Sequence, residues 1–272
     1  MLKFACRILF GFGTALRSNI WKIFWLGLLA LPAICNAESV FVPVFIDARS
    51  EAKLGAFPYD RGVYADALTA FEKLGAKGVV LKFFLDQPKG KGDDALALAM
   101  TKLPVLLQAR CDDSEVNPNP LDARFSTAIG KQTTFAVTCK SGWIPLVQLQ
   151  RNASDVCFID QPAVDVALWL ERYQGRAVKT LYACALALAN KPVPAADSNG
   201  SRKVDLAKVP RFDVISLVDV LDGKIDRTRI VGKIIVFGYE GSKAAMFDST
   251  IGRISAHRAF MLNLRAMEQL PN

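Results

Sequence analysis

The feature that most constrains the fold is a helical segment flanked by two short apolar segments. Residues 40–46 and 79–85 are nearly continuous apolar runs of strand length. Such runs are typical of parallel strands that have both faces covered. Between them, apolar side chains recur at helical spacing on one face, at Tyr64, Ala67, Leu68, Phe71 and Leu74. The pattern predicts a strand–helix–strand crossover, which requires a parallel sheet.

The rest of the chain continues this alternation, with one exception. Residues 47–50 are turn-like, and residues 133–138 and 143–149 resemble two strands joined by a tight turn. The other predicted strands lie at 104–109, 212–216 and 233–237. Helices are predicted at 93–100, 164–173, 180–188 and 255–269, and a short helical segment follows the strand at 212–216 and ends at 221. We therefore expect an α/β fold with a mostly parallel central sheet, helices on both faces and an antiparallel addition.

The first 37 residues have the pattern of an export signal. They contain no acidic residue and four basic ones, followed by an apolar run at 23–35 and a small-residue site that ends at Ala37. We expect a signal peptide at 1–37, cleaved after Ala37, and a soluble domain at 38–272. An uncleaved N-terminal membrane anchor is the alternative, because residues 8–16 are also apolar. The domain would be periplasmic or secreted in the first case, and anchored to the inner membrane facing the periplasm in the second.

The charge of the chain is mild once this segment is set aside. The full sequence has 34 basic and 26 acidic residues, and removing the four basic residues of 1–37 leaves a net charge of +4. The basic residues are scattered rather than clustered, so no nucleic-acid partner is expected. Contact with a membrane is expected only through residues 1–37, if they are not cleaved.

Four cysteines follow the export segment: Cys111, Cys139, Cys157 and Cys184. An even number of cysteines in an oxidising compartment predicts disulfides, although buried free thiols are the alternative. Three pairings are possible, and the spacing does not choose among them. No Cys-x-x-Cys unit is present, so neither a zinc site nor thioredoxin-like chemistry is expected.

An ordered set of short segments resembles one known family. These segments are 45–50, 54–61, 74–80, the acidic helix start at Asp94, 219–223 and 231–238, followed by Asp248 and His257. Together they resemble the type-two CHASE domains, which are extracellular sensory domains associated with cyclases and histidine kinases. The resemblance spans about 40–265 and implies a sensory domain that recognises a small molecule or an envelope protein.

The chain also departs from this family in ways that bear on function. It has Lys82 where the family usually has an acid, and its loop after Asp248 is short. Family members are usually joined to an output domain, whereas this sequence stops at Asn272, so we expect any signal to pass to a separate protein. The departures favour an alternative function, an envelope protein–protein adaptor that lacks a ligand pocket.

The candidate ligand-binding residues come from strand ends and from the resemblance. Ligands of open α/β sheets bind at the carboxyl ends of strands. The candidates are Asp47, Arg61, Lys82, Tyr239, Glu240, Asp248 and His257. Asp47 and Arg61 either form an ion pair or hold a polar ligand, or else they cap and brace the loop. His257, the only histidine, is either a structural residue or a pH-sensitive ligand contact.

No catalytic apparatus is apparent in the sequence. It contains no Gly-x-Ser-x-Gly elbow, and one histidine is too few for a zinc site. We therefore expect no enzyme activity, no metal and no cofactor. An α/β hydrolase remains as a further alternative, which would require Ser242, Ser249 or Ser255 to lie within hydrogen-bond reach of His257.

Overall fold

The computed structural model describes residues 39–130, 134–195 and 200–270. The predicted signal or anchor segment at 1–37 lies outside these residues. Within the described ranges, no helix is both long enough and apolar enough to cross a membrane.

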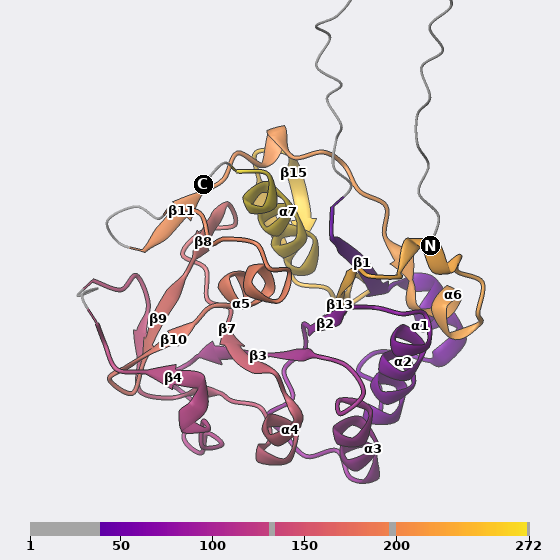
Figure 1. The fold of residues 1–272 in the computed structure, drawn as a ribbon, viewed down its shortest axis with the longest axis horizontal. Coiled ribbons are helices and arrows are strands. Elements are labelled where there is room, and N and C mark those ends of the chain that lie inside the picture. The colour runs from indigo at the N-terminus through magenta and orange to yellow at the C-terminus, as the bar shows by residue number, and fades with distance from the viewer. Residues whose placement is uncertain (1–38, 131–133, 196–199, 271–272) are drawn as a thin grey trace, which may run out of the picture. The chain divides into compact units, whose positions relative to one another are not determined.

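A seven-stranded, mostly parallel sheet forms the centre of the fold (Figure 1). Its order is β12-β1-β13-β2-β3-β6, and β7 also pairs with β3. All of these pairings are parallel except that of β3 with β6. The strands are β1 (Phe41–Ile46), β2 (Gly78–Leu81), β3 (Val105–Cys111), β6 (Gly142–Trp143), β7 (Asp155–Phe158), β12 (Ile215–Ser216) and β13 (Ile234–Tyr239). The predicted crossover from β1 to β2 exists, but β13 lies between the two strands.

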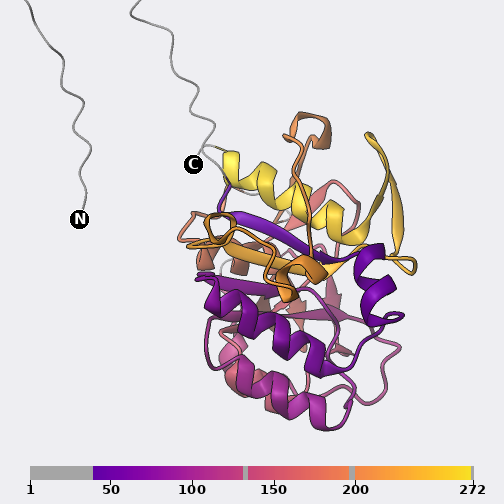
Figure 2. The same cartoon turned by 90° about the vertical axis from the view of Figure 1, so that its right-hand side faces the viewer.

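Alternation along the strands divides the interior into two cores. On β13, Ile235 and Phe237 belong to one apolar cluster, and Ile234 and Val236 belong to the other. This arrangement explains the continuous apolar runs, because each side chain is buried whichever face it points to. Helices cover both faces, with α7 on one side and α2 and α3 on the other (Figure 2). The expected α/β architecture is therefore confirmed.

The helices begin at polar capping residues in several cases. Asp47 caps α1, Asp60 caps α2 and Ser255 caps α7, each by accepting a backbone N–H of the first turn. The α-helices are α1 (Ala48–Leu54), α2 (Arg61–Lys73), α3 (Lys91–Ala99), α4 (Val147–Asn152), α5 (Leu181–Leu188), α6 (Leu217–Leu221) and α7 (Ala256–Gln269). Short 3₁₀ turns lie at Ala123–Phe125, Leu206–Lys208 and Arg227–Arg229.

Three smaller sheets, two antiparallel and one mixed, supply an antiparallel part, but residues 134–138 and 143–149 do not pair with each other as predicted. The first has the order β4-β10-β9-β5, the second pairs β8 with β11, and the third is the hairpin of β14 and β15. Their strands are β4 (Ser126–Thr127), β5 (Thr138–Cys139), β8 (Val166–Leu168), β9 (Leu170–Tyr173), β10 (Arg176–Lys179), β11 (Ser201–Lys203), β14 (Met246–Ser249) and β15 (Gly252–Ser255). In the first sheet, β5 pairs with β9 in parallel.

The prediction of a helix at 164–173 is wrong, because this segment forms β8 and β9. The reason lies in the turn that follows β9. Gln174 and Gly175 both have positive φ angles, 49° and 77°, and they join β9 to β10 as a two-residue hairpin loop. Such a loop matches the twist of paired strands, so cross-strand pairing overrides the helical spacing of the apolar residues.

Other predicted boundaries also differ. Residues 47–50 start a helix rather than a turn, and strand β2 ends at Leu81 rather than at residue 85. The segment 143–149 is a strand only at its start and becomes α4. Residue 133 lies outside the described residues, and of 134–138 only Thr138 lies in a strand, β5. Of the strand predicted at 212–216, only Ile215 and Ser216 form one, β12. Strand β7 was not predicted. Its four buried residues form a run too short to stand out from the neighbouring polar chain.

Two disulfides confirm the prediction from the cysteine count. Cys111 pairs with Cys139, which joins β3 to β5, and Cys157 pairs with Cys184, which joins β7 to α5. Both bridges therefore tie the central sheet to the elements beside it. They indicate that the chain folds in an oxidising compartment.

Candidate ligand-binding site

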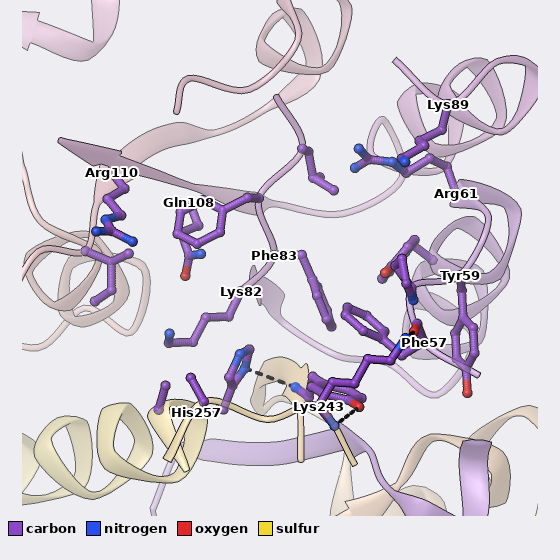
Figure 3. Close-up of a pocket in the computed structure, with 18 of the residues that line it drawn as sticks. Phe57, Tyr59, Arg61, Lys82, Phe83, Lys89, Gln108, Arg110, Lys243 and His257 are labelled. Atoms are coloured by element: carbon purple, nitrogen blue, oxygen red, sulfur yellow. Dashed lines mark hydrogen bonds between the residues drawn. The ribbon is translucent and has the colours of Figure 1, made fainter. Parts of the chain in front are cut away.

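A cavity of about 710 Å³ lies at the carboxyl ends of β2, β3 and β13 (Figure 3). This volume is in the range of small-molecule sites. Seven aromatic side chains line it: Phe57, Tyr59, Tyr64, Phe83, Phe84, Tyr239 and Phe247. Five basic side chains line it as well, namely Arg61, Lys82, Lys89, Arg110 and Lys243, together with His257 and a single acid, Asp160. The wall is thus aromatic and strongly basic.

Lys82 is the most unusual of these basic residues. It directly follows β2 and is only 6% exposed. No carboxylate or hydrogen-bond acceptor among the described residues contacts its ammonium group, which lies 5.3 Å from the centre of the Phe260 ring. Burial without a counter-ion lowers the pKa of Lys82 to about 7. The cavity therefore contains a buried amine that an anionic ligand would stabilise in its charged form.

His257 stands beside Lys82 and has a fixed tautomer. Its Nδ1 accepts a hydrogen bond of 3.0 Å from the backbone N–H of Tyr239, so the neutral ring carries its proton on Nε2. Burial, and then the charge of Lys82, hold the pKa of His257 well below its ordinary value. The contact needs Gly238, because a Cβ there would lie 2.3 Å from Nδ1. His257 is therefore a neutral donor at physiological pH.

Arg61 opens α2 and points into another part of the cavity. Its side chain is 4% exposed, its Nε lies 3.5 Å from a carboxylate oxygen of Asp93, and its Nη2 donates to the carbonyl of Gln87. Its Nη1 has no hydrogen-bond partner among the described residues. The hypothesised Asp47–Arg61 ion pair is wrong, because Asp93 is the acid beside Arg61 and Asp47 is used elsewhere.

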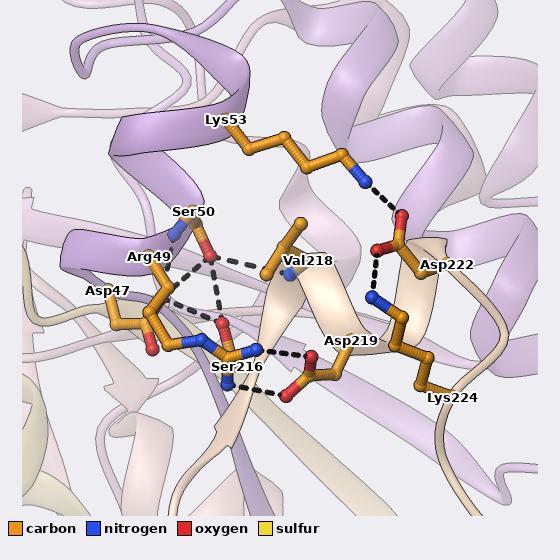
Figure 4. A network of polar contacts seen from close by, with 9 residues as sticks. All are labelled: Asp47, Arg49, Ser50, Lys53, Ser216, Val218, Asp219, Asp222 and Lys224. Carbon is orange, nitrogen blue, oxygen red and sulfur yellow. Dashed lines mark hydrogen bonds and ion pairs between the residues drawn. The ribbon is translucent and has the colours of Figure 1, made fainter.

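Three of the seven candidates do not line the cavity. Asp47 accepts hydrogen bonds from the backbone and hydroxyl of Ser50 and from the hydroxyl of Ser216 (Figure 4). Glu240 binds the guanidinium of Arg258 through both oxygens. Asp248 is exposed on β14. The structure therefore brings together Arg61, Lys82, Tyr239 and His257, and places the other three outside.

The aromatic wall is continuous from the histidine to the far side. The ring of Phe83 lies 6.0 Å from that of His257 and 6.1 Å from that of Phe57, centre to centre. Phe57 in turn stacks on Tyr239 at 4.1 Å. The hydroxyl of Tyr239 donates to Glu51 and accepts from the N–H of Lys243, which fixes this ring in place. The wall is therefore rigid and apolar where it meets the polar residues.

The single acid of the wall belongs to a pair of carboxyl groups. Asp160 accepts a 2.7 Å hydrogen bond from the N–H of Cys111, and its own N–H donates to Glu171, which is fully buried. Burial raises the pKa of both groups, and the charge of Asp160 raises that of Glu171 further. The two carboxyl groups thus share a buried environment that favours the protonated form of Glu171 over its charged form.

Metal binding and hydrolysis find little support around the cavity. Two clusters of possible metal ligands occur among the described residues, Asp155–Cys157–Cys184 and Cys111–Asp160–Glu171, but their cysteines are in disulfides. The three serines named as potential nucleophiles donate elsewhere: Ser242 to Glu51, Ser249 to the carbonyl of Gly252, and Ser255 to Glu240. The contact with His257 that a hydrolase would require is thus not formed.

Sequence reasoning missed several residues of the wall. Gln108 and Arg110 lie at the end of β3, a predicted strand, so the rule that selected Lys82 would also have found them. Asp160 was missed because β7 was missed. Phe57 and Lys243 come from loops, and only the folded chain brings them to the cavity.

Comparison with known proteins gives one match. Residues 14–255 match the CHASE2 domain, which covers most of the chain and agrees with the resemblance found in the sequence. No curated protein and no solved structure matches the chain. Given the extent of this match, the chain belongs to the CHASE2 domain family, a family of sensory extracellular domains.

Proposed function

We propose that this chain is a sensory domain of the cell envelope that recognises a small molecule in the cavity at the carboxyl ends of β2, β3 and β13. One observation carries the proposal. Two buried polar atoms of residues that line the cavity have no hydrogen-bond partner in the part of the chain that the structure describes: Nη1 of Arg61 and Oε1 of Gln108. An unpaired buried polar group costs about 1–3 kcal/mol, so a ligand that pairs with these atoms recovers that free energy.

Membership of a sensory family and the two disulfides support a location in the envelope. The domain is then periplasmic or secreted, with anchoring to the inner membrane as the alternative. The ligand acts by stabilising the conformation that binds it better, and a partner protein reads that conformation.

A role as a protein–protein adaptor is the second candidate, and the β14–β15 hairpin favours it. This hairpin exposes three large apolar side chains, Met246 (43% exposed), Phe247 (46%) and Ile251 (42%). Phe247 also lines the cavity, so a partner that covers the hairpin would contact the rim of the site.

A thermal-shift screen of the purified protein against a metabolite library tests the proposal. A ligand at 100 times its Kd adds about 2.7 kcal/mol of stability. Ala245 is exposed at the cavity wall, so Ala245→Trp blocks the entrance without changing the core. The matched control is Ala52→Trp, at an exposed position of α1.

We expect a compound that stabilises the wild type and Ala52→Trp but not Ala245→Trp. A library without any stabilising compound contradicts the proposal and favours the adaptor. A compound that stabilises all three proteins equally places recognition outside this cavity and contradicts it as well.

A further inference from the structure

We propose that the ligand is a small aromatic carboxylic acid, whose carboxylate binds Lys82 and the Nε2–H of His257 and whose ring lies against Phe57 and Phe83. This inference deepens the proposed function and rests on it. It assigns a chemical class to the ligand and a role to each part of the wall.

The charge of the cavity requires an anion. Five basic side chains line it, against one acid, Asp160. Arg61 has Asp93 nearby, and Nε of Arg110 lies 3.7 Å from Asp160. Lys82, by contrast, is 6% exposed and lacks a counter-ion among the described residues. A buried charge is tolerated when it is paired, so the missing partner of Lys82 is an anionic group.

His257 supplies the second donor for that group. The N–H of Tyr239 occupies Nδ1, so Nε2–H is the free donor of a neutral ring. Figure 3 shows the ammonium end of Lys82 between Gln108 and Arg110 on one side and His257 on the other. Two neighbouring donors suit the two oxygens of a carboxylate, and their burial strengthens the interaction.

The adjoining wall selects the rest of the ligand. Phe83 directly follows Lys82 in the chain, and its ring is 6.0 Å from that of His257 and 6.1 Å from that of Phe57. The apolar surface thus begins next to the two donors. A flat ring bonded to a carboxylate, directly or through a short linker, fits this arrangement, because the ring can pack against the aromatic wall while the carboxylate reaches the two donors.

A phosphate fits less well, because the loop after β13 offers no free cradle. Such loops bind phosphate through unpaired backbone N–H groups. Here the N–H of Glu240 donates to the carbonyl of Ile46, that of Ser242 to Glu51, and that of Lys243 to the hydroxyl of Tyr239. Asp160, which also lines the cavity, disfavours a doubly charged group. A singly charged carboxylate is therefore preferred.

Isothermal titration calorimetry with matched probes tests this assignment. The probes are benzoate, phenylacetate and indole-3-acetate, their neutral amides, and phenyl phosphate. We expect the carboxylates to bind at least about tenfold more tightly than their amides, the effect of one charged hydrogen bond. Lys82→Met, which keeps the volume and removes the charge, should weaken carboxylate binding about 10- to 100-fold and change amide binding less than about threefold.

The matched control variant is Lys102→Met, which removes an exposed lysine after α3 and should leave every affinity unchanged. Circular dichroism and the melting temperature confirm that both variants fold. Amides that bind as tightly as the acids, phenyl phosphate that binds more tightly, or carboxylate binding that persists in Lys82→Met would overturn the assignment. Each of these results leaves the proposed small-molecule sensor standing, provided that Ala245→Trp abolishes the binding.

If the carboxylates fail to bind while another library compound binds in an Ala245→Trp-sensitive manner, the assignment is wrong and the sensor remains. If nothing in either set binds, both proposals fail.

Discussion

Two polar clusters lie near the same edge of the central sheet and differ in one respect. The first ties α1 to α6 and consists of Asp47, Arg49, Ser50, Lys53, Ser216, Asp219, Asp222 and Lys224 (Figure 4). The second lines the cavity and includes Lys82, Gln108 and Arg61 (Figure 3). In the first, every charged side chain has a partner within the chain. In the second, buried polar atoms are left without one.

The α1–α6 cluster is built around Asp47 and two ion pairs. Burial raises the pKa of Asp47, but hydrogen bonds from Ser216 and Ser50 outweigh it and hold the pKa below its ordinary value. Arg49 binds Asp219 through two hydrogen bonds of 2.8 and 2.7 Å, and Lys53 pairs with Asp222. These contacts satisfy the start of α1 and fix it against α6.

The comparison distinguishes polar groups that stabilise the fold from polar groups that would be available to bind a ligand. A polar group that is bonded within the chain contributes to folding, so its removal lowers the stability of the free protein. A buried polar group without a partner opposes folding, so its removal raises that stability and weakens ligand binding. Substitutions in the two clusters should therefore have opposite signs.

The largest effect is expected for Lys82→Met, which should stabilise the ligand-free protein by about 3 kcal/mol at pH 7, because it removes the cost of an unpaired buried charge. The pKa of Lys82 is about 7 in the folded protein and ordinarily 10.5, so the unfolded chain binds more protons between these values. The gain in the free energy of unfolding should therefore be fully present below pH 7 and disappear as the pH rises to 10.5.

Urea denaturation at several pH values measures this gain. The other titratable groups of the wall have to be considered in fitting the curve, and they are Tyr59, Arg61, Tyr64, Lys89, Arg110, Asp160, Tyr239, Lys243 and His257. A variant that is less stable than the wild type at pH 7 would show that Lys82 supports the fold. It would contradict the expectation that substitutions in the two clusters have opposite effects on stability.

Asp47→Ala should have the next largest effect, a loss of about 2 kcal/mol, because it leaves two hydroxyls and the N–H of Ser50 without their acceptor. Asp47→Asn keeps one acceptor oxygen and should lose less than half as much. Urea denaturation measures both. Ligand affinity should be unchanged, and a variant with normal stability but reduced affinity would instead place Asp47 in recognition.

Asp219→Asn should have the smallest effect, a change in melting temperature of no more than about 2 °C, because 63% of the partner side chain, Arg49, is exposed to solvent. The difference from the wild type should disappear in 1 M salt, which screens exposed charges. Differential scanning calorimetry at low and high salt provides the measurement. A loss several times larger would show that α1 depends on this ion pair rather than on its cap.

Local pattern was sufficient for much of the fold. The runs at 40–46 and 233–237 indicated buried parallel strands, since both of their faces contact a core. Helices α2, α5 and α7 and the presence of disulfides also followed from spacing and composition. The segment at 164–173 did not follow, because its strands depend on partners, β10 and β11, that lie elsewhere in the chain.

In the candidate site too, local pattern identified some residues, and only the folded chain revealed the others. Position at a strand end identified Tyr239, because the apolar run at 233–237 marks where that strand stops. Lys82 was also selected as a strand-end residue, although the predicted strand ran on to residue 85 and only the structure shows that β2 ends at Leu81. Only the tertiary structure decided which residues meet there. It inserted β13 between β1 and β2, brought His257 to Tyr239, and placed Asp93 rather than Asp47 beside Arg61. By itself, the sequence determined the type of sheet and the edge at which the cavity lies, since these depend on local burial. Contacts between distant residues decided which strands lie side by side, which side chains form ion pairs and hydrogen bonds, and which buried charges stay unpaired.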